Sequence, residues 1–161
     1  MHNYLHKIFV IIIFYLYLLI NIFVYVFFNQ GFYCSQAVLC SYCEQFGLDK
    51  DTASRIAIPF GAGIGYTGNM CGAVAGALMV IGLKYGNTDP DDMDAKKKVF
   101  AATQKFIVEF MDRHATINCT ELLGYDLSDP DQRFEAKSKG VTKEKCPVFV
   151  KDAAKILDLI L

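Results

Sequence analysis

Residues 60–82 read FGAGIGYTGNMCGAVAGALMVIG, and this stretch decides the fold. Its first half is a glycine-rich loop, and its second half is an apolar segment that predicts a helix. Cys71 stands where the loop becomes the helix. Because unpaired backbone N–H groups and the helix dipole stabilise an anion at such a position, we expect the pKa of the Cys71 thiol to be lowered.

The glycines of this stretch need a structural or functional reason. Gly72 and Gly76 are four residues apart and share one helix face. Glycine inside a helix costs about 0.5–1 kcal/mol relative to alanine, so the pair predicts close approach of a second helix or of a cofactor. Together with the loop residues Gly61, Gly63 and Gly65, these two are candidate cofactor-binding residues. Nucleotide binding is disfavoured, because no Lys follows the loop in the P-loop manner and no strand pattern precedes it.

The rest of the chain also has a helical pattern. Apolar residues recur at spacings of three and four in several segments, with Gly47 as a stop signal and Asp49 or Asp51 as a cap. Helices are expected near residues 34–46, 49–59, 71–82, 91–114 and 119–124, and from Cys146-Pro147 to the end, whereas residues 125–140 are expected to be a solvated polar connection. No segment alternates in the manner of a strand. The sequence predicts an all-α fold, a compact multi-helix bundle with a Gly-rich loop, preceded by a hydrophobic N-terminal helix.

Length and charge divide the chain into two parts. Residues 1–29 form the expected hydrophobic helix, and residues 30–161 form one helical domain that contains the cysteines. After residue 33 the chain carries 15 Lys and Arg against 17 Asp and Glu, a formal charge of -2. No basic stripe interleaves with aromatic residues, so nucleic acid is not an expected partner.

The apolar run of residues 8–28 is long enough to cross a bilayer as a helix of about 20 residues. One interpretation is a single N-terminal membrane anchor, with Lys7 placing the N-terminus in the cytoplasm. That orientation would put the cysteines outside the cell, which conflicts with free thiols. The other interpretation is a misassigned start, because the composition of the run is typical of translated AT-rich non-coding DNA.

The chain has six cysteines, which is more than packing requires. Four of them fall at or near expected helix starts, where thiolates are stabilised: Cys34, Cys71, Cys119 and Cys146. Cys40 and Cys43 form a C-x-x-C on a helix, but no strand leads into it, so they are expected to be buried small residues. The pattern favours a reducing, cytoplasmic setting in which thiols do redox or metal chemistry.

These motifs resemble the family of redox-active proteins named C_GCAxxG_C_C after its cysteine pattern. The resemblance covers about residues 30–160 and rests on GFYCSQAV (31–38), Arg55 with FGAGIG (60–65), CGAVAGA (71–77), CTELLG (119–124) and Cys146. It implies a helical fold, four functional cysteines, a redox role and a redox or transport-associated partner. Cys40 and Cys43 are additional to the family pattern, and the hydrophobic leader departs from it.

Three functional hypotheses follow. In the first, Cys34, Cys71, Cys119 and Cys146 ligate an iron–sulfur cluster or zinc, both of which accept four thiolates. In the second, the same cysteines form a thiol–disulfide relay of an oxidoreductase or electron carrier, with Cys71 as the attacking thiolate and Cys34 as the second catalytic residue. In the third, the chain is a membrane-anchored, disulfide-stabilised structural or transport-accessory protein.

Overall fold

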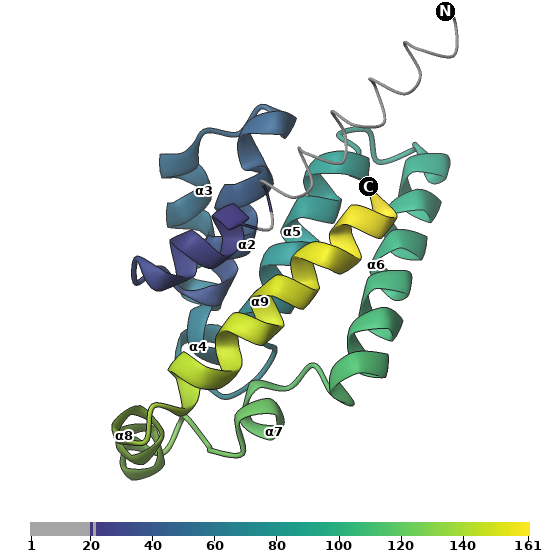
Figure 1. Cartoon of the computed structure of the whole chain (residues 1–161). Coiled ribbons are helices and arrows are strands. Elements are labelled where there is room, and N and C mark those ends of the chain that lie inside the picture. The colour runs from purple at the N-terminus through teal and green to yellow at the C-terminus, as the bar shows by residue number, and fades with distance from the viewer. Residues whose placement is uncertain (1–19, 21) are drawn as a thin grey trace, which may run out of the picture.

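The structure, a computed structural model, describes Ile20 and residues 22–161 (Figure 1). Its helices are α2 (Cys34–Tyr42), α3 (Lys50–Ala57), α4 (Gly61–Gly65), α5 (Gly72–Tyr85), α6 (Met93–His114), α7 (Cys119–Leu123), α8 (Pro130–Ser138) and α9 (Val141–Ile160), with the 3₁₀ turns η1 (Cys43–Phe46) and η2 (Ile58–Phe60). Residues 22–29 are helical as well. The described residues contain an isolated antiparallel bridge between Met70 and Asn118 and no strand. The all-α prediction is confirmed.

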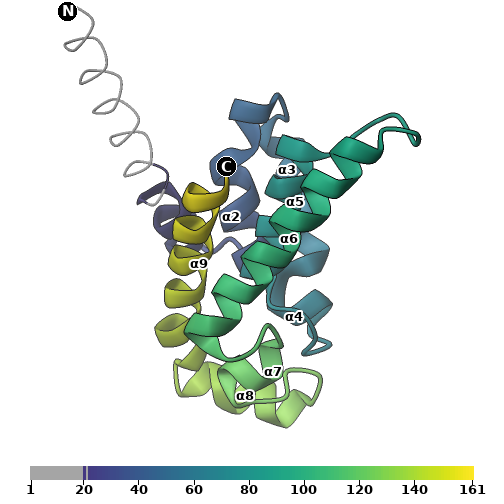
Figure 2. The same cartoon turned by 90° about the vertical axis from the view of Figure 1, so that its right-hand side faces the viewer.

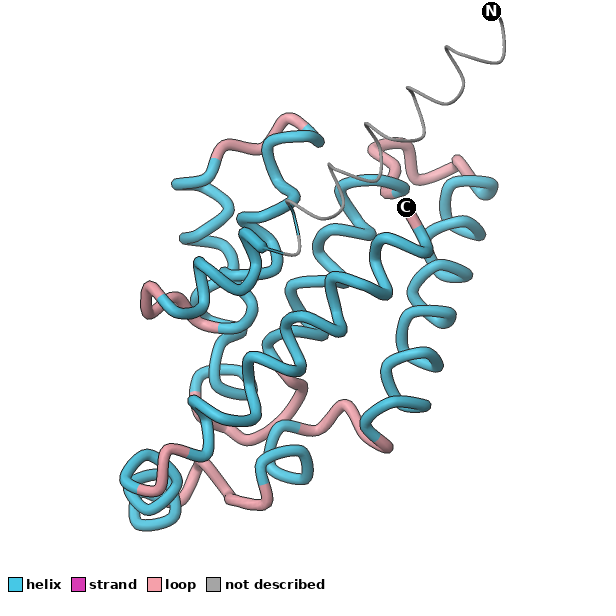
Figure 3. The backbone as a smooth tube through the Cα atoms, in the orientation of Figure 1, coloured by secondary structure: helices cyan, strands magenta, loops and turns pink. Residues whose placement is uncertain are grey.

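Helix α5 is the central element of the bundle. It packs against α2, α6 and α9, and its side chains are buried on most of its circumference, as expected for a helix that is apolar all round. In Figure 1, α9 runs across α5, against which it packs. In both Figure 1 and Figure 2, α7 and α8 lie at the same end of the bundle. The tube in Figure 3 shows that short loops join most of the helices.

Side-chain caps set several helix starts. The carboxylate of Asp49 accepts a hydrogen bond from the backbone N–H of Thr52 at 2.9 Å at the start of α3, which confirms the expected cap. Asn118 caps α7 in the same way, accepting from the N–H of Glu121 at 3.0 Å. Gly47 ends η1 in the left-handed conformation that glycine adopts without steric cost.

Two predicted boundaries are wrong at the C-terminal end. The stretch expected to be a solvated connection contains α8, which begins with Asp129 as its cap and Pro130 in its first turn. Helix α9 begins at Val141 instead of at Cys146, so Pro147 lies inside it. Proline at that position removes one helical N–H donor, but the helix continues through it from the turn that begins at Val141. Cys146 therefore lies more than one turn into the helix. Cys146 is therefore not a helix-start cysteine.

The glycines of α5 allow α2 to approach very closely. A Cβ added at Gly76 would lie 2.6 Å from the carbonyl oxygen of Ser35 and 3.1 Å from the Cβ of Val38. A Cβ added at Gly72 would lie 3.2 Å from the Cβ of Cys34. Of the two reasons predicted for these glycines, the structure shows the approach of a second helix.

The hydrophobic N-terminal segment lies mostly outside the described residues, which exclude 1–19 and 21. Where it is described, Val24 is fully buried in the core of the bundle, and the ammonium group of Lys151 in α9 lies 4.0 Å from the centroid of the Tyr25 ring. Within the described part of the chain, none of the helices combines the length and the apolar character that a bilayer crossing demands.

Candidate functional site

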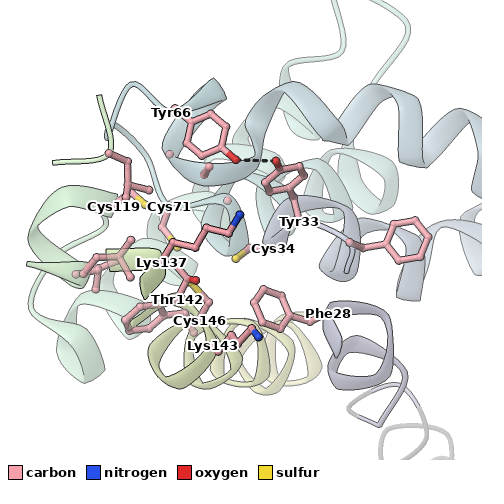
Figure 4. Close-up of a pocket in the computed structure, with 18 of the residues that line it drawn as sticks. Phe28, Tyr33, Cys34, Tyr66, Cys71, Cys119, Lys137, Thr142, Lys143 and Cys146 are labelled. Carbon is pink, nitrogen blue, oxygen red and sulfur yellow. Dashed lines mark hydrogen bonds between the residues drawn. The ribbon is translucent and has the colours of Figure 1, made fainter. Parts of the chain in front are cut away.

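Four of the six cysteines line one cavity of about 490 Å³: Cys34, Cys71, Cys119 and Cys146 (Figure 4). They come from the first residue of α2, the N-cap of α5, the first residue of α7 and the interior of α9. All four are buried. The chain thus brings together the four cysteines that the sequence singled out.

The other two cysteines are packed into the core. The Cys40 thiol donates to the backbone carbonyl of Lys50 at 3.9 Å, and the Cys43 thiol donates to the carbonyl of Cys40 at 3.5 Å. Both are buried, and the described lining of the cavity does not include them. The expectation that this C-x-x-C is a pair of buried small residues is confirmed.

Two loop segments running in opposite directions hold Cys71 and Cys119 together. The N–H of Cys71 donates to the carbonyl of Ile117 at 2.8 Å, and the N–H of Cys119 donates to the carbonyl of Asn69 at 2.6 Å. The glycine-rich loop packs directly against this pairing, because a Cβ added at Gly63 would lie 2.6 Å from the Cβ of Cys119. Backbone hydrogen bonds therefore fix the positions of these two cysteines.

The glycine-rich loop forms a left-handed turn beside the cavity. Positive φ angles occur at five consecutive residues: Ala62, Gly63, Ile64, Gly65 and Tyr66. Left-handed backbone costs an L-residue about 1–2 kcal/mol, and three of these five are not glycine. The turn places the Tyr66 hydroxyl 2.9 Å from that of Tyr33, at the edge of the cavity (Figure 4). Strain of this kind concentrates at functional sites.

The pKa values of the Cys34 and Cys146 thiols depend on each other. Hydrogen bonding with Cys34 lowers the pKa of Cys146 in spite of its burial. The same hydrogen bond raises the pKa of Cys34 well above its ordinary value, and burial and the neighbouring cysteines add to that rise. When one proton leaves the pair, it therefore leaves from Cys146, and the negative charge resides on the sulfur of Cys146.

Cys71 and Cys119 are electrostatically different from Cys146. Burial raises the pKa of Cys71 to about 11, although the backbone N–H groups of Ala73 and Val74 act to lower it. Burial likewise raises the pKa of Cys119 to about 12. The predicted lowering of the Cys71 pKa is wrong. The helix N-terminus acts in the expected direction, but the loss of solvent around the thiol outweighs it.

Several lining residues did not figure in the sequence interpretation as site residues. Tyr33 and Tyr66 line the cavity, as do Arg133, Lys137 and Lys143 from α8 and α9. Arg133 and Lys137 are four residues apart on a helix that the Asp129-Pro130 start signal could have revealed. The position of α8 against the cysteines had no signal in the sequence.

The five predicted cofactor-binding glycines separate into two groups. Within residues 22–161, the lining of the cavity includes Gly63 and Gly72 and leaves out Gly61, Gly65 and Gly76. Gly61 instead accommodates the Tyr33 side chain, with an added Cβ only 2.5 Å from the Tyr33 Cβ. The contacts of Gly63, Gly72 and Gly76 are close approaches of protein to protein. A role for any of the five with a cofactor stays a prediction.

Four thiols in one cavity are a suitable donor set for zinc or an iron–sulfur cluster. Their placement does not match such a site: among Ile20 and residues 22–161, no three or more His, Cys, Asp or Glu side chains are arranged to hold a metal ion. The six cysteines are free thiols in the structure. The ligand role of Cys34, Cys71, Cys119 and Cys146 stays a prediction.

Comparison with known proteins agrees with this cysteine arrangement. Residues 32–160 match the model of the family described as "Putative redox-active protein (C_GCAxxG_C_C)". No curated protein and no solved structure matches the chain. The match spans most of the sequence and includes all four cysteines of the cavity, so the chain belongs to the C_GCAxxG_C_C family of redox-active proteins.

Proposed function

We propose that the protein is a thiol–disulfide oxidoreductase or electron carrier whose reactive pair is Cys34 and Cys146. The placement of both thiols in the cavity, together with the lowered pKa of Cys146, carries this proposal. A nucleophilic thiol needs a lowered pKa and access to its substrate. Cys146 has the lowered pKa, and it lines the cavity.

The proposed reaction consists of two exchanges. The Cys146 thiolate attacks one sulfur of a substrate disulfide, forms a mixed disulfide and displaces the first substrate thiolate, which takes up a proton. Cys34 then gives up its proton and attacks the Cys146 sulfur, which displaces the second substrate thiolate and forms the Cys34–Cys146 disulfide. Two electrons pass from the pair to the substrate. An external dithiol reductant returns the pair to its starting state by the reverse exchanges.

The roles differ in part from those expected from the sequence. Cys34 keeps its predicted catalytic role, as the resolving thiol. Cys146 replaces Cys71 as the attacking thiolate, because the pKa of about 11 at Cys71 leaves that thiol protonated near neutral pH. Cys71 and Cys119 contribute polarisable sulfur atoms to the cavity wall. Their burial keeps both thiols uncharged beside Cys34 and Cys146.

Mass mapping of the oxidised protein tests the pair. After treatment with a small disulfide, we expect a single Cys34–Cys146 disulfide and a fall in titratable thiols from six to four. Cys34→Ser and Cys146→Ser should each abolish this disulfide. Cys40→Ser is the matched control, since Cys40 is buried outside the cavity. A disulfide between any other two cysteines as the main product would contradict the proposal.

Metal analysis of protein purified without air separates the two cysteine hypotheses. The dithiol proposal expects no stoichiometric iron or zinc. Metal bound in equal amount to protein, and lost from both Cys34→Ser and Cys119→Ser, would overturn the proposal in favour of thiolate ligands.

The proposal places the protein in the cytoplasm, where thiols are kept reduced and a dithiol partner is at hand. A redox protein or a transport-associated protein is the proposed partner. Native protein whose cysteines are all paired in disulfides would favour the alternative, a membrane-anchored, disulfide-stabilised structural or transport-accessory protein. Mass mapping without reduction distinguishes the two.

A further inference from the structure

Three cationic side chains line the cavity of the four cysteines. We call Arg133, Lys137 and Lys143 the cationic rim. Arg133 and Lys137 come from α8, and Lys143 comes from the first turn of α9. Figure 4 shows the Lys137 side chain reaching over the cavity, with its ammonium group between the tyrosine pair and Cys34 in that view.

The charge of the rim is not compensated within the described part of the chain. None of the three side chains has an ion-pair partner among Ile20 and residues 22–161, whereas the nearby Lys139 pairs with Glu135 at 2.5 Å. The described lining contains no Asp or Glu. The part of the chain after residue 33 has a formal charge of -2, so this concentration of positive charge is local. A concave site lined by one sign of charge attracts ligands of the other sign.

Arg133 is held in place at the rim. Its guanidinium carbon lies 4.8 Å from the centroid of the Tyr66 ring, and its Nη1 donates to the carbonyl of Leu127 at 3.4 Å. Tyr66 is in turn positioned by the left-handed turn and by its hydrogen bond with Tyr33. The strained turn therefore helps to position a cation at the cavity.

The walls below the rim are apolar. Phe28, Phe32, Leu122, Leu127 and Phe149 line the cavity beside the sulfurs. The volume of about 490 Å³ falls within the roughly 300–1,000 Å³ of sites that enclose organic ligands. An inorganic oxyanion would leave most of this volume and all of the apolar wall without contacts. The ligand that fits both rim and walls is an organic anion.

We propose that the substrates of the cavity are small organic disulfides that carry carboxylates, with the carboxylates bound at the cationic rim and the disulfide bond against Cys146. This inference rests on the thiol–disulfide function proposed above and names its substrate class. The rim contributes twice to the reaction. It attracts the anionic disulfide, and it stabilises the thiolate that leaves when Cys146 attacks. The atoms and electrons balance as in the two exchanges already given.

Two aromatic disulfides of similar size but different charge test the inference. Dithiobis(nitrobenzoate) carries two carboxylates, and dithiodipyridine is neutral; both release a thiol that is followed by absorbance. The measured quantity is the ratio of their second-order rate constants at low salt, each divided by the same constant for a small free thiol. We expect the normalised ratio to favour the anion, and to fall about three- to tenfold in Lys137→Gln and in Arg133→Gln.

The matched control is Lys98→Gln, which removes the same charge from an exposed position on α6. This variant should keep the wild-type ratio. Raising the ionic strength should lower the ratio in the wild-type protein more than in Lys137→Gln, because salt screens exposed charges. An unchanged ratio in both rim variants, or an equal fall in the control, would overturn the substrate class.

The two proposals fail in different ways. If the neutral reagent still produces the Cys34–Cys146 disulfide while the ratio shows no preference for the anion, the substrate class is wrong and the reactive pair stands. If neither reagent produces that disulfide, the reactive pair is wrong, and the substrate class falls with it.

Discussion

At the scale of single residues, the four cavity cysteines differ in the pKa of their thiols and in what raises or lowers it. Hydrogen bonding with Cys34 lowers the pKa of Cys146. Cys71 receives backbone N–H groups at a helix N-terminus, but burial raises its pKa to about 11. A position at a helix start is visible in a sequence, whereas the depth of burial and the meeting of two cysteines more than a hundred residues apart in one cavity are not. The sequence therefore identified the four cysteines, but its prediction of a lowered pKa at Cys71 is wrong.

Alkylation as a function of pH tests this ordering. A thiol reacts only as its thiolate, and a pKa of about 11 leaves about one part in a thousand of Cys71 ionised near pH 8. We expect iodoacetamide to modify Cys146 first at that pH, and Cys71 only as the pH approaches its pKa. The measurement is modification of each cysteine by peptide mass spectrometry, with unfolded protein as the control for intrinsic reactivity.

The same experiment probes the hydrogen bond. Cys34→Ala removes the donor, so the pKa of Cys146 should rise and its modification near neutral pH should slow. Cys34→Ser keeps a hydroxyl donor and should slow it less. Modification of Cys71 ahead of Cys146 near pH 8 would show that the helix start, and not the contact with Cys34, controls thiolate formation.

At the scale of elements, α5 and the loop before it were the most predictable part of the molecule. The spacing of Gly72 and Gly76 indicated a smooth face, and α2 packs on that face. The alternative of a cofactor at this face could not be excluded from the sequence, because close approach of either kind requires glycine. Helix α8 was missed because its polar composition resembles that of a solvated loop, and its sequence does not show that Arg133 and Lys137 line the cavity.

A pair of glycine substitutions in α5 tests the packing with α2. Gly76→Ala should destabilise the protein by about 1–3 kcal/mol, since the new Cβ would lie 2.6 Å from a backbone oxygen of α2 that cannot move aside. Gly82→Ala lies in the same helix with open space around the added Cβ, so it should stabilise by about 0.5–1 kcal/mol through helix propensity. Urea unfolding followed by circular dichroism measures both. Equal effects of the two substitutions would contradict the close-packing interpretation.

At the scale of the whole molecule, the site exists only in the assembled bundle. Its cysteines come from four helices, and backbone pairing between the segments around Met70 and Asn118 joins two of them. The cysteine pattern and the all-helical class could be predicted because both are local properties of the sequence. The cationic rim, the tyrosine pair and the interaction of Cys34 with Cys146 depend on tertiary contacts, which periodicity does not encode.

Oxidation of the reactive pair should change the stability of the entire fold. A Cys34–Cys146 disulfide would join α2 to α9 and close a loop of more than 100 residues. Such a cross-link lowers the entropy of the unfolded chain and is worth up to about 4.7 kcal/mol for a loop of about 100 residues. For a chain of this size, each kcal/mol shifts the melting temperature by about 2–4 °C. We therefore expect the oxidised protein to melt about 5–15 °C higher than the reduced protein.

Calorimetry of the two redox states of one preparation measures this shift, and renewed reduction should reverse it. Cys34→Ser treated with the same oxidant is the control, and its melting temperature should not change. The shift also reports on the geometry of the pair, because only sulfurs that lie close together can be linked without moving α2 or α9. A mapped Cys34–Cys146 disulfide that lowers the melting temperature would mean that forming it distorts the bundle, and that the hydrogen-bonded thiols are not placed for exchange.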